Sequence, residues 1–353
     1  MNPLAAGADH LLVEAESVTQ FTWDYEPSNT QLTRLYEKGK VSQWNATTDV
    51  DWSPDVRWGE PDPSMTDEER AMIGSFLNLD APDSPFAGMT EEQRAVVGWE
   101  LQAWMVSQFM HGEQGALICT AKIVETVPWI DAKYYASTQV MDEARHVEVF
   151  ARYLDTKLSG HYPVNAHLKM LLDDIITDSR WDMTYLGMQV MVEGLALAAF
   201  GFMHQMSTEP LLKQLLRYVM SDEARHVAFG VLSLQEYYAN LSDAEIFERQ
   251  QFAFEAAVRM RDRFLQQEVW ERMDVPVKDA IEAVMRTPTR QLFQIMLFSK
   301  IVPNCKKLGL LDRNDAWLRR RFEEIGVIQF EDWEDTGSEY ESFALTDADQ
   351  RSA

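Results

Sequence analysis

The stretch MDEARHV at residues 141–147 returns almost unchanged as SDEARHV at residues 221–227. Upstream, EQGALI at 113–118 has a counterpart in EGLALA at 193–198. The offset is the same in both cases, 80 residues from 113 to 193 and from 143 to 223. An internal repeat reveals architecture, and this one predicts two equivalent pairs of helices in an all-α protein.

Each copy has the symmetry of an antiparallel helix hairpin. The lone glutamate precedes the E-x-x-H motif by 30 residues, and the midpoint falls on Pro128 in the first copy and on Thr208 in the second. Residues equally far from the turn of a hairpin lie at the same height, here about 22 Å from it at roughly 1.5 Å per residue. The two hairpins can therefore meet at one level in the core of a four-helix bundle.

The repeated residues have the chemistry of a dinuclear metal site. Glutamate and histidine at positions i and i+3 project from one face of a helix. Two lone glutamates and two E-x-x-H pairs give the four carboxylates and two imidazoles of di-metal proteins built on helical bundles. Oxygen and nitrogen donors without thiolate favour iron or manganese over structural zinc. The predicted ligands are Glu113, Glu143, His146, Glu193, Glu223 and His226.

The alternative is that these side chains only pack the core. One E-x-x-H motif is weak, because glutamate is common and a histidine on an inner helix face is usually a satisfied core residue. Two copies with a glutamate at the matching height are hard to attribute to packing. Glu113 and Glu193 also lie in apolar surroundings, where carboxylates are rarely buried without a partner. The repeat therefore favours the metal site.

Asp142 and Asp222 each precede a histidine by four residues and share its helical face. Metal-bound imidazoles usually donate their other N–H to a carboxylate. We therefore expect both aspartates to support the predicted ligands, with Arg145 and Arg225 neutralising them. The alternative is that these four residues are ordinary surface charges.

The chain is predicted to have three parts. Residues 1–88 are rich in Pro, Asp and Trp and are expected to form an irregular N-terminal arm wrapping the bundle, with short helices at 31–40 and 66–77. Residues 89–327 form the helical domain, with about seven or eight long helices. Residues 328–353 are acidic and predict a mobile tail. The tryptophans expected to anchor the arm are Trp23, Trp44, Trp52 and Trp58.

Several helix boundaries are predicted from capping residues. Thr90 with Gln93 has the pattern of a capping box, and prolines at 128 and 210 suit the first turn of a helix. Candidate N-caps follow from residue type and position; they are Ser207, Ser242 and Asp243.

Composition excludes some classes of partner. The net charge is −25, from 57 acidic and 32 basic residues, and so negative a surface repels nucleic acid and anionic lipid. No apolar run reaches the roughly 18 residues of a membrane span, and the stretch at 190–203 reads as a buried core helix. The start of the chain lacks signal-peptide features. Two cysteines predict no disulfide framework. Together these features predict a cytoplasmic protein.

The ligand pattern, with EARH at both 143–146 and 223–226, resembles the ferritin-like di-iron carboxylate superfamily in its oxygen-activating branch. That branch includes ribonucleotide reductase small subunits and related ligand-binding oxidases, multicomponent monooxygenase hydroxylases, acyl carrier protein desaturases and arylamine N-oxygenases. The VAFG stretch at 227–230 and the segment 35–52 add to the likeness. The resemblance implies a ferritin-like four-helix bundle with flanking helices, two iron ions or a Mn/Fe pair, and O2 as a reactant.

Three positions depart from particular members of that branch. Phe150 stands where reductase small subunits commonly have a radical tyrosine, and Leu197 where monooxygenases have a threonine that assists oxygen handling. Val219 stands where arylamine N-oxygenases add a third histidine, four residues before the last glutamate. These departures leave the branch open.

The favoured function is a di-iron oxygenase that hydroxylates, N-oxygenates or desaturates a hydrophobic small molecule. Electrons would come from an external reductase or ferredoxin, because the chain has no flavin or nicotinamide motif. The main alternative is a radical-generating or ligand-binding oxidase subunit with Fe/Fe or Mn/Fe, and an oxygen or peroxide scavenger is a third. A homodimer is an open alternative to a monomer. The residues expected to line the substrate pocket, or else simply the core, are Phe109, Ala116, Phe150, Leu172, Ile176, Leu197 and Gly201.

Overall fold

A computed structural model describes residues 13–56, 81, 83–158 and 160–338 of the chain. Within these residues every regular element is helical and none is a strand, so the predicted all-α class is confirmed. The predicted helix at 66–77, Trp58 and most of the acidic tail lie outside the described residues. The α-helices are α1 (Thr30–Val41), α3 (Glu91–Thr126), α4 (Ile130–Tyr153), α5 (Ala166–Thr177), α6 (Trp181–Tyr185), α7 (Glu193–Met206), α8 (Pro210–Ala239), α9 (Asp243–Asp262), α10 (Gln267–Arg272), α11 (Val277–Met285), α12 (Pro288–Met296), α13 (Ile301–Lys307) and α14 (Arg313–Glu324).

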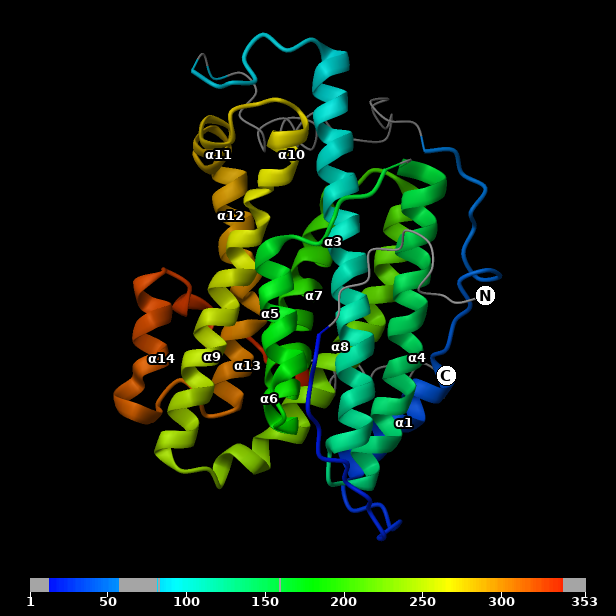
Figure 1. The fold of residues 1–353 in the computed structure, drawn as a ribbon, viewed down its shortest axis with the longest axis vertical. Helices are drawn as coiled ribbons and strands as arrows, with labels where there is room; N and C mark the ends of the chain where they lie inside the picture. The colour runs from blue at the N-terminus through cyan, green and yellow to red at the C-terminus, as the bar shows by residue number, and fades with distance from the viewer. Residues whose placement is uncertain (1–12, 57–80, 82, 159, 339–353) are drawn as a thin grey trace, which may run out of the picture.

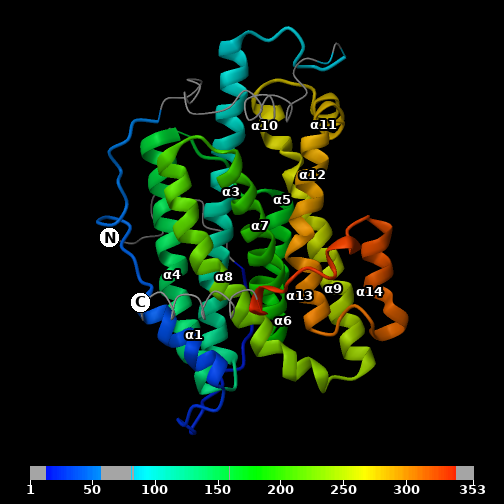
Figure 2. The same cartoon turned by 180° about the vertical axis from the view of Figure 1, so that it is seen from behind.

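Two antiparallel hairpins form the core of the molecule. α3 and α4 pack along their lengths, and α7 with the segment before it packs on α8 (Figures 1 and 2). The first turn lies between Thr126 and Ile130 and the second between Met206 and Pro210, so both are centred where the repeat predicts. The hairpin symmetry read from the sequence is therefore present in the fold.

The helix caps agree with the sequence at two of the predicted positions. The Thr90 side chain accepts from the Gln93 N–H in a complete capping box that begins α3, and Ser242 caps α9 in the same way. Ser207 does not cap α8, which is a correction. The Glu209 carboxylate takes that place, accepting from the backbone N–H groups of Leu211 and Leu212 at 2.7 and 2.6 Å.

The segment before α7 departs from regular α-helix. A π-helix, η2 (Leu186–Val192), joins α6 to α7 and ends directly before Glu193. Such wide turns occur frequently at functional sites. The whole helical stretch Trp181–Met206 is long and apolar enough to cross a membrane, but 72% of its most apolar window is buried inside the molecule. It is therefore placed as a core helix, in agreement with the prediction for 190–203.

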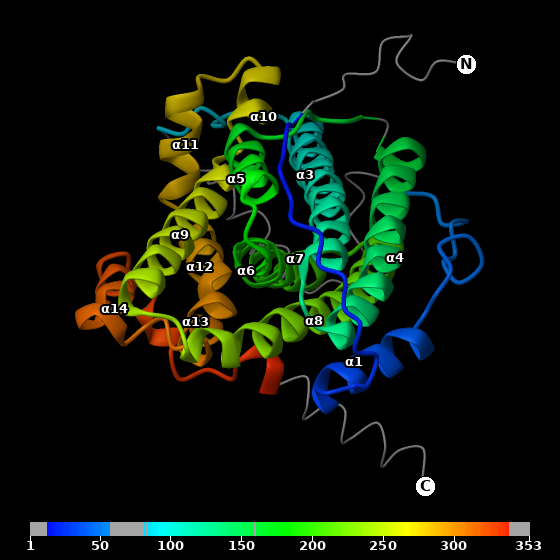
Figure 3. The same cartoon turned by 60° about the horizontal axis from the view of Figure 1, so that its bottom comes forward.

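Beyond α8 the chain covers one side of the bundle and is more broken than predicted. α9 packs on η2 and α14 packs on α9, with α12 and α13 beside them (Figure 3). Pro276 and Pro288 stand at the starts of α11 and α12, where proline cannot continue a preceding helix. Gln266 adopts a left-handed conformation with φ 57° and separates α9 from α10.

The N-terminal arm is tied to the first hairpin. α1 packs across α4, and the Asp131 carboxylate accepts from the Ser28 and Asn29 backbone N–H groups. Trp44 is buried and Trp52 packs against the core. Trp23 is 78% exposed and is not an anchor, because it lies on an extended surface segment where its ring contacts Phe21.

The predicted division at residues 88/89 and 327/328 stays a prediction. Just beyond the second boundary, Phe330 is buried in the core. Thr336 is also buried, and its backbone N–H donates to the Asn304 side chain at 2.9 Å. Residues 328–338 therefore pack on the body of the protein.

Close approach of α8 to the π-helix requires a glycine. A Cβ on Gly230 would lie 2.6 Å from the Cβ of Gln189. We expect Gly230→Ala to lower the free energy of unfolding by about 1–3 kcal/mol through overpacking. In Gly201→Ala, the new methyl would meet only the Met220 side chain at 3.7 Å. That control should be about 0.5–1 kcal/mol more stable, because alanine loses less backbone freedom. Urea denaturation of both variants measures the difference, and equal effects would contradict the packing argument.

Candidate metal centre

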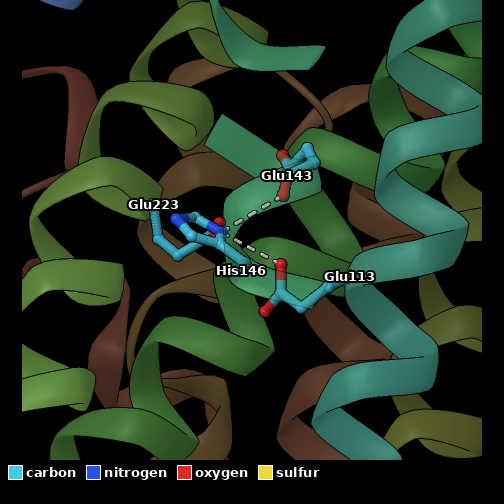
Figure 4. Close-up of side chains that lie close together, drawn as sticks. All are labelled: Glu113, Glu143, His146 and Glu223. Atoms are coloured by element: carbon cyan, nitrogen blue, oxygen red, sulfur yellow. Dashed lines mark hydrogen bonds and ion pairs between the residues drawn. The ribbon is translucent and has the colours of Figure 1, made fainter. Parts of the chain in front are cut away.

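The structure brings all six predicted ligands together in the bundle core. Each of them is at most 5% exposed. They come from α3, α4, α7 and α8, and they form two groups within which the candidate ligand atoms lie within 4.8 Å of one another. One group is Glu113, Glu143, His146 and Glu223, drawn in Figure 4. The other is Glu143, Glu193, Glu223 and His226.

Glu143 and Glu223 belong to both groups, which is the placement of bridging carboxylates. The His146 Nδ1 atom lies 3.3 Å from Glu143 Oε2 and 3.0 Å from Glu223 Oε1. The His226 Nδ1 atom lies 3.1 and 3.4 Å from the other oxygens of the same two carboxylates. Metal–ligand bonds of about 2.1 Å separate neighbouring ligand atoms by roughly 3 Å. The spacing therefore suits two ions side by side.

Unsatisfied polar atoms provide the test of whether metal fits here. Both carboxylate oxygens of Glu223, one oxygen each of Glu143 and Glu193, and Nδ1 of His226 are buried without a hydrogen-bond partner. Orphaned buried groups of this kind are costly and rare. All of them face the same small volume, so the donor set fits a pair of divalent cations.

Burial and repulsion between neighbouring carboxylates shift the pKa values of Glu113 and Glu193, each of which belongs to one ligand group only. Burial, followed by repulsion from Glu223, raises the pKa of Glu113 well above its ordinary value. Burial and repulsion from Glu143 and Glu223 do the same to the pKa of Glu193. Without metal these two groups therefore retain protons that a cation has to displace.

The pKa of Glu143, which belongs to both ligand groups, is shifted in the opposite direction. Although burial opposes it, the imidazoles of His226 and His146 hold the pKa of Glu143 below its usual range. Burial also opposes the shift in the histidines. The pKa of His146 is nevertheless raised by Asp222 and the surrounding glutamates, and that of His226 by Glu143 and Glu223. The metal-free centre is thus a mutually neutralising cluster of acids and imidazoles.

Asp142 and Asp222 support the histidines, but each contacts the histidine of the other copy. His146 Nε2 lies 3.2 Å from Asp222, and His226 Nε2 lies 3.3 Å from Asp142. An Nε2–H donated to aspartate leaves Nδ1 available on the side of the glutamates. Asp142 and Asp222 approach each other across the bundle, so the crossed pairing follows from the antiparallel packing of α4 and α8.

Two arginines, Arg145 and Arg225, contact the aspartates. Arg145 donates to Asp142 at 2.5 Å and to Asp222 at 3.1 Å. Arg225 donates to Asp222 and, at 3.5 Å, to Asp142. All four side chains are buried, which excludes the alternative that they are surface charges.

Two supporting residues escaped the sequence reading. Gln139, fully buried one turn before Glu143, donates to Glu143 and Glu193 at 2.9 and 3.0 Å. Trp44, predicted only as a packing anchor, donates its indole N–H to Asp222 at 2.8 Å. The i, i+4 spacing to Glu143 could have indicated Gln139, whereas the contact of Trp44 spans 178 residues and has no local signal.

A cavity of about 20 Å³ adjoins the centre, roughly the space of one water. Three glutamates of the centre stand at it, and the remaining wall is mostly apolar. A Cβ added to Gly112 would meet nothing within 4 Å, in keeping with open space there. The lining residues are Gln108, Phe109, Gly112, Glu113, Ala116, Val192, Glu193, Ala196, Phe200, Glu223 and Arg263.

Of the residues predicted to line a substrate pocket, Phe109 and Ala116 stand at this cavity. Phe150 lies behind it, with its ring 5.9 Å from those of Phe109 and Phe200. Leu172 fills the space over Gly115 of α3. Ile176 is half-buried against the core, Leu197 is buried on α7 and Gly201 faces Met220. A pocket role for these five residues stays a prediction.

A buried carboxylate and histidine cluster held between two antiparallel hairpins defines the ferritin-like di-iron carboxylate class. Within that class, the family model described as p-aminobenzoate N-oxygenase AurF matches residues 26–309. The chain belongs to this family and is a di-iron oxygenase, as the sequence predicts.

Solved structures of R2-like ligand-binding oxidases are similar to the chain, and the first given below shares its fold. An R2-like ligand-binding oxidase with an aerobically reconstituted metal cofactor after photoconversion is 19% identical, with a TM-score of 0.52, over 79% of this chain and 93% of that one. A structure of such an oxidase with an aerobically reconstituted Mn/Fe cofactor is 20% identical, with a TM-score of 0.46, over 76% and 92%. No curated protein gives a significant match.

Proposed function

We propose that Glu113, Glu143, His146, Glu193, Glu223 and His226 hold two iron ions, and that the small molecule to be oxidised binds at the cavity beside them by displacing side chains of its wall. The observation that carries this proposal is the pair of ligand groups sharing Glu143 and Glu223. When bound, the iron pair supplies reductive activation of O2.

The protein's own residues position the ligands and keep the site dry. Gln139 holds the carboxylates of Glu143 and Glu193 from two different helices. Asp142 and Asp222 accept the Nε2–H of the histidines and fix the ring orientation. The apolar wall of the cavity, with Phe109 and Phe200, excludes water from the reacting side of the centre.

The substrate proposed for the site is a small, largely apolar molecule. N-oxygenation is the outcome that the family description favours. Val219, which is fully buried, stands where arylamine N-oxygenases have a third histidine. Because that histidine is absent from this position, hydroxylation and desaturation are the alternative reactions. We also propose that a reductase or ferredoxin supplies the electrons. The proposed location is the cytoplasm, and the proposed oligomeric state is a homodimer.

The test is to mix anaerobic Fe(II)-loaded protein with O2 and to follow the visible spectrum by stopped flow, with and without p-aminobenzoate and other arylamines. We expect two irons per chain, an optical change on mixing that arylamine accelerates, and an oxidised product by mass spectrometry. Protein that binds no iron would overturn the proposed site. A stable 1:1 Mn/Fe content with no turnover of any small molecule would favour the radical or ligand-binding alternative.

A further inference from the structure

A chain of aromatic side chains leads away from the metal centre, and it begins at Tyr135 of α4. Tyr135 is buried one turn before Gln139, which donates to two ligands of the centre. Burial lowers the pKa of His226, Glu143 and Glu223 raise it, and the Tyr135 hydroxyl adds to the increase. Tyr135 therefore lies beside a ligand of the proposed iron pair.

Three further rings continue the chain toward solvent. Phe229, one turn after His226 on α8, has its ring 4.4 Å from that of Tyr135 and 5.0 Å from that of Tyr185. The Tyr185 ring in turn lies 5.8 Å from that of Trp181, the first residue of α6. The first three rings are buried and Trp181 is partly exposed. The chain thus connects the buried centre to the surface.

Other partly exposed aromatic rings surround the outer end of the chain. The Trp181 ring lies 5.0 Å from that of Trp129 and 4.7 Å from that of Tyr237. Both of these neighbours are partly exposed. A soluble molecule can therefore reach the outer end without entering the bundle.

Packing alone does not account for the residue types in this chain. At the 80-residue offset of the repeat, Tyr135 corresponds to Leu215. By the same offset Phe229 corresponds to Val149, so the equivalent helices of the other copy pack without these rings. The Tyr185 hydroxyl is buried without a hydrogen-bond partner among the described residues. Phenylalanine would fill the same space without that cost, so the hydroxyl needs a chemical reason.

Tyrosine and tryptophan can each give up one electron to a strong oxidant, which phenylalanine resists. Burial raises the pKa of Tyr185 well above its ordinary value, although the nearby Ser233 hydroxyl opposes the shift. The phenol is therefore neutral at physiological pH, and it releases its proton only when it is oxidised. Rings at these short separations exchange electrons readily with their neighbours.

We propose that Tyr135, Tyr185 and Trp181 form a relay that passes one electron at a time from the protein surface to the O2-oxidised metal centre when no substrate is bound. Without the relay, the oxidising centre would attack the nearest side chains of its cavity, among them Phe109 and Phe200. The relay is a protective activity beyond the oxidation of a substrate, and it rests on the proposed function.

Each transfer along the relay is balanced in electrons and protons. Tyr135 gives an electron to the metal centre, Tyr185 replaces it, and Trp181 replaces the electron of Tyr185. Both tyrosines regain their phenolic protons, so the net loss is one electron to the centre and the indole proton of Trp181 to water. A soluble thiol then returns a hydrogen atom to Trp181, and two thiyl radicals combine into a disulfide.

A second aromatic route has to be distinguished from this one. The Trp44 ring lies 6.4 Å from that of His146 and 4.8 Å from that of Tyr218. The Trp44 indole donates to Asp222 at 2.8 Å, so this residue already supports a ligand. A variant of Trp44 is needed to decide which of the two routes carries the electron.

The experiment mixes anaerobic Fe(II)-loaded protein with O2 in the absence of organic substrate and freezes samples at intervals for electron paramagnetic resonance. Protein with ring-deuterated tyrosine is compared with ordinary protein. The variants are Y135F, Y185F, W181F and W44F, with Y238F as the control. We expect wild type to form a radical whose spectrum narrows on tyrosine deuteration, and we expect Y135F to lose that signal.

The control replaces a tyrosine of the same kind outside the relay. Tyr238 is 1% exposed, and its hydroxyl is also buried without a hydrogen-bond partner among the described residues, but its ring lies 6.1 Å from that of Tyr237 instead. Y238F should therefore form the radical as wild type does.

The order of the relay is tested by adding glutathione in a second mixing step. The radical of wild type and Y238F should disappear when the thiol is added. In Y185F and W181F it should form on Tyr135 and persist, because the route to the surface is interrupted.

Damage to the cavity wall provides a second readout. Peptide mass spectrometry after repeated exposure to O2 without substrate measures oxygen incorporation into Phe109 and Phe200. Incorporation should increase in Y135F and Y185F and should stay at the wild-type level in Y238F. Equal incorporation in all of these proteins would contradict a protective role.

Thermal melting separates the relay from a structural role. Y185F removes an unsatisfied buried hydroxyl and should melt at or above the wild-type temperature, so a lower temperature would overturn the assignment of Tyr185. A tyrosine radical that survives in Y135F would overturn the relay, and its loss in W44F alone would assign the route to Trp44. Iron content is measured on the same samples. Failure to bind iron counts against the proposed function, and iron-loaded wild type without a tyrosine radical counts against the relay alone.

Discussion

Replacing Glu223 by alanine is expected to remove both irons and to lower turnover by at least about a thousandfold, or roughly 4 kcal/mol of transition-state stabilisation. Glu223 belongs to both ligand groups, and its carboxylate lies within 3.4 Å of both histidines. Its loss therefore weakens both metal positions together. Glu143→Ala should have the same effect for the same reason.

The informative comparison with Glu223→Ala is a variant of a residue that belongs to only one of the two ligand groups. His146 belongs to one group, so His146→Ala should retain about one iron per chain. Glu148, exposed on α4, provides the matched control, and Glu148→Ala should keep both irons and full turnover. Iron is counted by plasma emission spectrometry after desalting. Two irons retained in Glu223→Ala would contradict the shared-carboxylate arrangement.

Removing the metal is expected to make stability fall as pH rises. In the metal-free fold the pKa values of Glu113, Glu193, His146 and His226 are all raised. The folded state therefore holds more protons than the unfolded chain above pH 4.5 for the glutamates and above pH 6.5 for the histidines. By linkage, the free energy of unfolding falls by about 1.4 kcal/mol per pH unit for each such proton.

Groups whose pKa values are lowered in the folded state do not cancel this fall of the free energy of unfolding with pH. Asp142, Glu143 and Asp222 have depressed pKa values, so they contribute stability above their unfolded values, near pH 4, that is lost as pH falls. Between pH 5.5 and 8 that contribution is constant. Burial also lowers the pKa values of His111 and His204, so these two groups add stability as pH rises, but only near and below their unfolded value of 6.5. The net expectation is a metal-free protein that is more stable at pH 6 than at pH 8.

Iron loading should reverse the pH effect and raise the melting temperature by about 5 °C at a thousandfold excess over the dissociation constant, from roughly 4 kcal/mol of binding linkage. Binding displaces the retained protons, so iron affinity should increase with pH. Calorimetric melting of metal-free and loaded protein at pH 6, 7 and 8 measures both trends. A metal-free protein that gains stability from pH 6 to pH 8 would contradict the assigned shifts.

The parts of the fold that follow from local spacing could be predicted from the sequence. Both hairpin turns, the all-α class and the meeting of six side chains follow from a repeat whose elements are separated by fixed intervals. The interrupted helices after α8 were harder to place, because the left-handed Gln266 is imposed by tertiary packing.

Contacts between residues far apart in the sequence could not be predicted from local spacing. The crossed contacts of Asp142 and Asp222 depend on how α4 meets α8, and the indole of Trp44 reaches Asp222 from α1's side of the molecule. Arg263 belongs to the stretch RDRF at 261–264, which reads as a solvated helix end. Only the fold reveals that one of its two arginines is buried.

The crossed contacts also bear on how such a protein can arise. Each hairpin carries an aspartate that contacts the histidine of the other hairpin, and Glu143 and Glu223 each belong to both ligand groups. One hairpin alone would lack a partner for every one of these contacts. Two identical hairpins related by a twofold axis would form all of them, because the axis would exchange the two ligand groups. The repeat is therefore consistent with descent from a homodimeric ancestor by gene duplication and fusion, after which each half was free to diverge.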